Sequence, residues 1–230
     1  MVAQSGKNTG LDEILAMVIK ELRNHDDYMK NFFNERVFRC LHINKNLLLD
    51  EGENDLRMLF FFCLTQRRQQ TFDNIIIGMN YFNKNQSNLV QTLEENFKNP
   101  EEKFERVEAI VYPHRKKGVG IGQKIGSLFL ELLVLYGNTC QEILPYLYVP
   151  IDENVQSVLE KLGIKDVPRV GTPINASKFR RFQDWLAKIA DENGRYRIHF
   201  DYLWYIYREF CRNNNCDECW IQAICNSRVT

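Results

Sequence analysis

The sequence predicts an all-α protein, and three observations carry this prediction. Apolar residues recur at helical spacing near the N-terminus, where they are Leu11, Ile14, Leu15, Val18, Ile19 and Leu22. Asn99-Pro100-Glu101-Glu102 is typical of a helix start, with a capping side chain, proline in the first turn and acids at the positive end. No internal repeat and no alternating strand pattern of useful length occurs. The 230 residues, 44% of them hydrophobic, suffice for one large domain or two small ones.

The first half of the chain is expected to hold a series of helices separated by polar segments. After the opening helix we expect further helices at about 27–41, 56–64, 75–81 and 87–97. Residues 50–54 form a polar break and a plausible domain boundary. The helix at 56–64 carries three consecutive phenylalanines and is expected to be buried on most sides, and Ser87 is expected to cap the last of the series.

The second half continues the helical pattern. The helix that starts at Asn99 should end or kink at Pro113. A helix is expected to begin at Asp152, as its N-cap, and to stop at Gly163 in the usual glycine-after-helix arrangement. Further helices are predicted at about 125–136, 175–190 and 198–210, and the last of these leads directly to Cys211.

Three glycines at alternate positions, Gly118, Gly120 and Gly122, mark a tight turn directly before an apolar helix. Their bare backbone allows another molecule to approach closely. The following helix N-terminus offers unpaired N–H groups and a positive dipole end, both of which suit a phosphate. The segment from Lys116 to Lys124 is therefore predicted to bind phosphate.

Four cysteines lie within fifteen residues, in the pattern Cys-x4-Cys-x2-Cys-x5-Cys: Cys211, Cys216, Cys219 and Cys225. This density in a chain with seven cysteines favours a metal centre. Zinc is an alternative, although zinc sites usually pair two Cys-x2-Cys knuckles and only Cys216-Cys219 is one. Cys40, Cys63 and Cys140 lie in apolar contexts and are expected to be small core residues. His199 and Trp204 are expected to be packing residues.

Charge and hydropathy narrow the class of protein. Thirty basic and thirty acidic residues give a net charge of zero, which argues against a protein that simply coats nucleic acid. Basic residues gather at 67–68, at 114–117 and around 178–181, where each cluster is either a solvated helix face or a local contact for DNA. No run of eighteen apolar residues and no signal-peptide pattern occurs, so we expect an intracellular protein, in the cytoplasm or nucleoid, with no membrane partner.

Two separate motifs resemble one family. Gly120-Ile121-Gly122-Gln123-Lys124 and the apolar residues after it resemble the second half of a helix-hairpin-helix, and Pro150-Ile151-Asp152 resembles a catalytic-aspartate segment. Together with the cysteine run they resemble the DNA glycosylase superfamily that contains endonuclease III. The family usually has six residues in the first gap between cysteines, where this chain has four. The segment 137–147 is also about ten residues longer than in endonuclease III itself.

The resemblance implies a function and a set of site residues. It implies a DNA glycosylase with associated AP lyase activity, a monomer acting on double-stranded DNA with a damaged base, by default an oxidised one, or an abasic site. Lys124 would be the nucleophile and Asp152 the catalytic carboxylate. The four cysteines would hold a [4Fe–4S] cluster. DNA contacts would come from Lys117, Gly118, Gly120, Gly122, Gln123 and, as a wedge in the base stack, Gln66.

The resemblance also implies two helical domains with the DNA cleft between them. Residues 1–50 with 149–230 would form the iron–sulfur domain, and residues 51–148 the helix-hairpin-helix domain. Simpler roles stay open for three side chains: Lys124 as a phosphate contact, Asp152 as a helix cap alone, and Gln66 as a polar helix end. A monofunctional glycosylase for a mismatched or damaged base and a non-catalytic DNA-binding module are the alternative functions.

Overall fold

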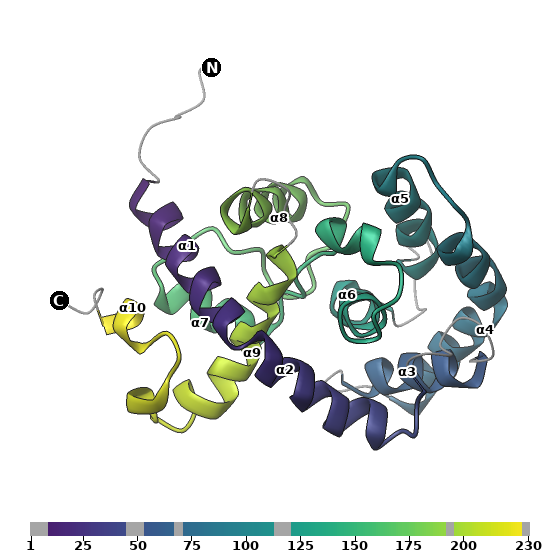
Figure 1. Cartoon of the computed structure of the whole chain (residues 1–230), viewed down its shortest axis with the longest axis horizontal. Coiled ribbons are helices and arrows are strands. Elements are labelled where there is room, and N and C mark those ends of the chain that lie inside the picture. Colours follow the sequence, from purple (N-terminus) through teal and green to yellow (C-terminus); the bar gives the residue numbers. More distant parts are fainter. Residues whose placement is uncertain (1–8, 45–52, 67–70, 113–120, 192–195, 227–230) are drawn as a thin grey trace.

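The computed structural model describes residues 9–44, 53–66, 71–112, 121–191 and 196–226. All regular secondary structure in these ranges is helical, and none of these residues lies in a β-strand. The all-α prediction is confirmed (Figure 1).

The chain opens with helices that follow one another almost without a break. α1 (Thr9–Asn24) and α2 (Asp26–Phe33) lead into η1 (Asn34–Arg39), a stretch with π-helical hydrogen bonding. Cys40 follows directly and is exposed, with its thiol donating to the carbonyl of Glu35 at 3.2 Å. Its prediction as a core residue was wrong, because the residue lies past the last helical turn, outside the buried face of the helix.

The next two helices correct the sequence prediction in both boundary and burial. α3 (Glu53–Thr65) is less buried than expected, since Met58 and Phe61 are each 41% exposed. α4 (Phe72–Glu94) replaces the two helices predicted there, and Ser87 lies in its interior instead of at a cap. Thr71 is the actual N-cap, and its hydroxyl accepts from the N–H of Asn74 at 3.2 Å.

α5 (Pro100–Val111) and α6 (Gln123–Glu131) come before and after the glycine-rich segment that was predicted to form a turn, and residues 113–120 of that segment lie outside the described part of the chain. α5 begins as predicted, with the side chain of Asn99 accepting from the N–H of Glu101 at 2.9 Å. The ring of Tyr112 packs directly over Gly126 of α6, where an added Cβ would lie 2.7 Å from ring carbon Cδ1. This glycine lets the end of α5 approach α6 closely.

The remaining elements follow α6 in chain order. They are η3 (Leu132–Tyr136), η4 (Gln141–Tyr146), α7 (Glu153–Lys161), α8 (Ser177–Ala190), η5 (Arg197–Tyr202), α9 (Leu203–Ile206), η6 (Tyr207–Cys211), η7 (Cys216–Glu218) and α10 (Gln222–Asn226). The predicted stop after α7 is confirmed, since Gly163 has a φ of 86°. The single helix expected at 198–210 is a succession of 3₁₀, α and π turns.

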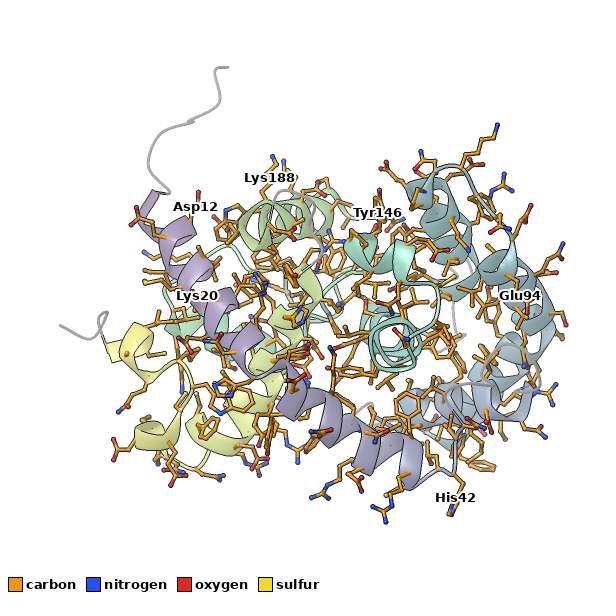
Figure 2. All side chains as sticks on the ribbon, viewed as in Figure 1. Asp12, Lys20, His42, Glu94, Tyr146 and Lys188 are labelled. Carbon is orange, nitrogen blue, oxygen red and sulfur yellow. The ribbon has the colours of Figure 1, made fainter. Side chains whose placement is uncertain are left out.

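α6 lies near the centre of the molecule, with α3, α4 and α5 on one side and α1, α7, α8 and α9 on the other (Figure 1). One continuous set of buried apolar residues runs through both groups of helices. Charged side chains such as Glu94 and Lys188 lie at the outer edge in Figure 2. The division into two domains at residues 51 and 149 stays a prediction.

The prediction that the chain has no membrane-spanning segment is tested by the length and apolarity of its helices. In the described part of the chain, no helix combines the length and apolarity that crossing a bilayer requires.

Candidate functional site

The two residues predicted to carry the chemistry are in contact. Nζ of Lys124 lies 2.9 Å from Oδ2 of Asp152, although 28 positions separate them in the chain. The side chain of Lys124 is 37% exposed and that of Asp152 12% exposed. The side chain of Lys124 is therefore partly accessible to solvent, while that of Asp152 is largely buried.

Both residues belong to the first turn of a helix, which fixes where their side chains point. Asp152 is the N-cap of α7, and its Oδ1 accepts from the N–H groups of Asn154 and Val155 at 2.9 Å each. Its other oxygen, Oδ2, is the one that faces Lys124. The cap prediction is confirmed, and the cap bonds leave one carboxylate oxygen for the lysine.

The segment that delivers Asp152 is held by buried polar side chains. Gln183, which is fully buried, accepts from the N–H of Val149 and donates to its carbonyl, each at 2.9 Å. Gln123 also donates to that carbonyl, at 3.2 Å. Arg197 donates to the carbonyl of Leu147 at 2.8 Å, and burial lowers the pKa of this guanidinium to about 10. Hydrogen bonds from three buried side chains therefore hold the backbone of the segment before Asp152 in place.

A pocket of about 400 Å³ opens beside the lysine. Its walls come from Tyr112, the first residues of α6, Ile151 and the loop 170–175. Gly171 turns that loop with a φ of 84°, and Val170 next to it is 47% exposed. The pocket combines an apolar wall with one amine and a helix N-terminus, which suits a ligand with an apolar face and an anionic group.

Two further carboxyl groups lie in the interior behind this pair. Glu131, at the end of α6, is 0% exposed, and Asp201 in η5 is 3% exposed. The two are hydrogen-bonded to each other, and burial is the largest cause that raises the pKa of both. The charges of Asp152 and Lys124 act on Asp201 in opposite directions, the first raising and the second lowering its pKa.

The predicted DNA-contacting residues have different environments. Gly122 is exposed, and a Cβ added to it would meet nothing within 4 Å. Gln123 is only 9% exposed, and its amide is engaged by the carbonyl of Val149. Gln66 is exposed at the end of α3, where its amide reaches Oγ1 of Thr65 at 3.3 Å. Lys117, Gly118 and Gly120 lie outside the described residues.

The four C-terminal cysteines lie close to one another. Burial raises the pKa of Cys219 to about 11, and the thiols of Cys211, Cys216 and Cys225 act in the same direction. The nearby amine of Lys161 acts on Cys211 in the opposite sense. Even so, no three His, Cys, Asp or Glu side chains within the described ranges stand in an arrangement that would hold a metal ion.

Aromatic residues fasten the cysteine segment to the N-terminal helices. Trp220 stacks on His25 with ring centroids 4.0 Å apart and on Tyr205 at 5.0 Å. His199, predicted as a packing residue, is 4% exposed, and its Nε2 lies 3.1 Å from Oδ1 of Asp26. Through Trp220, the cysteine segment is therefore packed against the N-terminal helices α1 and α2.

Sequence reasoning missed Glu131, Asp201 and Gln183. The available signal was an acid inside an otherwise apolar helix, since Glu131 interrupts the run from Ile125 to Tyr136. A charged residue on a buried helix face needs a partner, but the sequence does not say which one.

Comparison with family models, with curated proteins and with solved structures finds no match for this chain.

Proposed function

We propose that this protein is a base-excision-repair DNA glycosylase with associated AP lyase activity. Its substrate would be double-stranded DNA that contains a damaged base, with oxidised bases as the first class to test, or an abasic site. The observation that carries the proposal is the 2.9 Å contact between the amine of Lys124 and the carboxylate of Asp152 beside an open pocket. A nucleophile in contact with a base is the arrangement that covalent catalysis needs.

Three features support a DNA ligand at this place. The N-terminus of α6 supplies backbone N–H groups and a positive dipole end. Gly122 leaves open space over that backbone, so a phosphate can come close. The pocket volume of about 400 Å³ leaves room for a group rotated out of the duplex, as chemistry on a base requires.

The chemistry would proceed in two stages. A proton leaves the ammonium of Lys124 for the carboxylate of Asp152, and the free amine attacks C1′ of the extruded nucleotide. The bond from Nζ to C1′ forms as the bond from C1′ to the base breaks, and its electron pair leaves with the base, which is protonated by solvent. Asp152 gives up its proton to solvent, and the carboxylate restored in this way stabilises the positive charge that the sugar carries after base release. One proton then passes from the nitrogen to O4′ as the bond from C1′ to O4′ breaks, which opens the sugar ring and gives a protonated Schiff base. The Schiff base allows loss of a proton from C2′, and the electron pair of that C–H bond forms a double bond to C3′ as the 3′ phosphate departs.

The proposal includes a [4Fe–4S] cluster, supported by the number and spacing of the four thiols and not by their arrangement in the described residues. The thiols of Cys211, Cys216 and Cys225 act on the pKa of Cys219, so the four lie near one another, and aromatic stacking fixes the segment on the protein. Cys211, Cys216, Cys219 and Cys225 would hold the cluster, and bound there it would brace the loop instead of taking part in base release. Zinc held by the same thiols is the alternative.

Two other functions would share this surface. A monofunctional glycosylase would use Asp152 to activate water, and a non-catalytic module would use the end of α6 for phosphate alone. A DNA substrate would place the protein in the cytoplasm or nucleoid, and a monomer would suffice, since both reacting residues come from one chain.

Borohydride trapping on an abasic duplex tests the proposal. The wild-type protein should form a covalent adduct, and Lys124→Gln should abolish it, while the exposed control Lys188→Gln should leave it unchanged. An adduct that survives Lys124→Gln would remove the assigned nucleophile. Base release without an adduct would identify the monofunctional enzyme. Binding without base release, over a panel of single-lesion duplexes, would identify the non-catalytic module.

A further inference from the structure

We propose that Arg180 is a positioning residue that sets the shape of the pocket beside Lys124. It ties the loop 170–175, which forms one wall of the pocket, to Glu108 of α5, the helix whose end forms another wall. The shape of the pocket in turn selects the group that enters it. This role rests on the proposed function, because it makes Arg180 a determinant of which damaged base is released.

The wall at the end of α5 is held by contacts with α6. Tyr112, which lines the pocket, is 3% exposed, and its ring covers Gly126. Its hydroxyl lies 3.0 Å from Oγ of Ser127. Its backbone N–H donates to the carbonyl of Glu108 at 2.9 Å, so Glu108 lies one helical turn before a residue of the pocket wall. A bond to Glu108 is therefore a bond to this wall.

The loop 170–175, in contrast, makes almost all its hydrogen bonds to its own neighbours. Thr172 donates twice to the carbonyl of Arg169, through its N–H at 2.9 Å and its hydroxyl at 2.6 Å. In the described structure, only the carbonyl of Ile174 is hydrogen-bonded to a residue that does not adjoin the loop. That residue is Arg180, so Arg180 supplies the hydrogen bond that joins the loop to the rest of the molecule.

Arg180, in the first turn of α8, uses all three nitrogens of its guanidinium group. Nε donates to the carbonyl of Ile174 at 2.8 Å, while Nη1 donates to the hydroxyl of Tyr148 and Nη2 to Oε1 of Glu108. Tyr148 donates in turn to Oε2 of Glu108 at 3.1 Å. Because the donors of a guanidinium group lie in one plane at fixed directions, this arrangement fixes the loop relative to α5.

The position of the loop decides what the pocket admits. Val170, Pro173 and Ile174 of the loop are apolar residues that line the cavity of about 400 Å³. An apolar pocket discriminates between ligands by shape, so a shift of this wall changes which group fits next to Lys124. Arg180 is not one of the described residues that line the cavity, so it acts on a ligand only through the loop.

Base release is measured under single-turnover conditions, from duplexes that carry either one thymine glycol or one oxidised guanine. The first lesion is a pyrimidine and the second a larger purine, so the ratio of the two rates reports the shape of the pocket. Arg180→Met removes the guanidinium group but keeps a long side chain. It should slow release of the preferred base about tenfold, as expected for one altered contact in an apolar pocket, and move the ratio toward one. Lys188→Met, an exposed position on the same helix, should keep both rates and the ratio.

Two further comparisons separate this role from a general loss of structure. Arg180→Lys keeps the charge but has a single nitrogen, which cannot bond to Ile174 and Glu108 in the same arrangement, so it should behave like Arg180→Met. Both variants should trap an abasic duplex with borohydride at the wild-type rate. An abasic site presents no base to the pocket, and the contact between Lys124 and Asp152 does not involve Arg180.

The loop can also be followed without DNA, by hydrogen exchange. The N–H of Thr172 should lose protection in Arg180→Met, because the loop is no longer joined to α5. The N–H of Tyr112 should keep its protection, since it lies in the wall that α6 holds. Unchanged exchange at Thr172 would show that Arg180 does not hold the loop.

The possible failures are distinguishable. A wild-type ratio already at one, or a ratio that Arg180→Met leaves unchanged, overturns the selective role. Loss of abasic trapping in parallel with base release would show that Arg180 only stabilises the fold. If the wild-type protein forms no adduct and releases neither base, the proposed function falls and the selective role with it. Should Arg180→Met not fold, Arg180→Lys supplies the same comparisons of rate ratio, trapping and exchange.

Discussion

The side chain of Gln183 binds both backbone groups of Val149, accepting from its N–H and donating to its carbonyl at 2.9 Å. A side-chain amide thus replaces the backbone partner that an extended segment would find in a sheet. The segment fixed in this way ends, three residues later, at Asp152.

Gln183→Leu should destabilise the fold by about 2 kcal/mol, because it leaves the buried N–H of Val149 without its partner. Urea denaturation measures the loss. Gln91→Leu on the exposed surface of α4 serves as the matched control and should change stability by less than about 0.5 kcal/mol. Equal stability of the two variants would show that the amide does not hold the segment.

Gly126 and Gly122 offer a matched pair within one short segment. Gly126→Ala should cost about 1–3 kcal/mol, because its Cβ would overlap the buried ring of Tyr112. Gly122→Ala meets no atom within 4 Å and should cost less than about 1 kcal/mol, the loss of a tolerated N-cap residue. Thermal denaturation compares them.

For DNA affinity we expect the opposite order, with Gly122→Ala the more damaging of the two substitutions. If the backbone at Gly122 approaches a phosphate, Gly122→Ala weakens binding to an abasic duplex although the fold is intact. Unchanged affinity would show that the N-terminus of α6 does not lie against DNA.

Asp26 should make stability depend on pH. Although burial acts to raise it, hydrogen bonds from His199, Lys30 and Tyr202 lower the pKa of this carboxyl from its ordinary value of 3.8. A carboxyl with a lowered pKa stabilises the folded state above its unfolded pKa, and this contribution is lost as the pH falls below that value.

Asp26→Asn should therefore be less stable than the wild type at neutral pH by about 2 kcal/mol, as expected for hydrogen bonds to a charged group. The difference should shrink as the pH falls below 3.8. Urea titrations over a pH series measure it, with the exposed neighbour Asp27→Asn as control. A difference that does not change with pH would contradict the assignment.

The cysteine segment can be tested by metal content. Protein prepared without oxygen should contain iron and acid-labile sulfide, and Cys219→Ser should lower both, whereas Cys40→Ser should not, because Cys40 is exposed and distant in sequence from the cysteine run. Zinc in place of iron would select the alternative metal. The absence of both metals would remove the metal site.

The sequence by itself determined the features whose causes lie within a few residues. Asn99 caps α5, Asp152 caps α7 and Gly163 ends that helix, because each effect depends on a side chain or backbone angle beside the helix end. The failure at Ser87 has the same origin: a residue that can cap a helix starts one only where the helix is interrupted, and burial of Phe82 and Leu89 on the same face carries α4 through it.

Only the tertiary structure decided which distant residues meet. Lys124 reaches Asp152 across 28 positions, and Glu131 meets Asp201 across 70, so neither pairing leaves a local pattern. Such contacts require α6, η5 and the start of α7 to be placed correctly relative to one another, which depends on the shapes of many buried side chains together. A charged residue within an apolar helical run, such as Glu131, indicates that a partner exists, and the packing of the whole fold determines which residue that partner is.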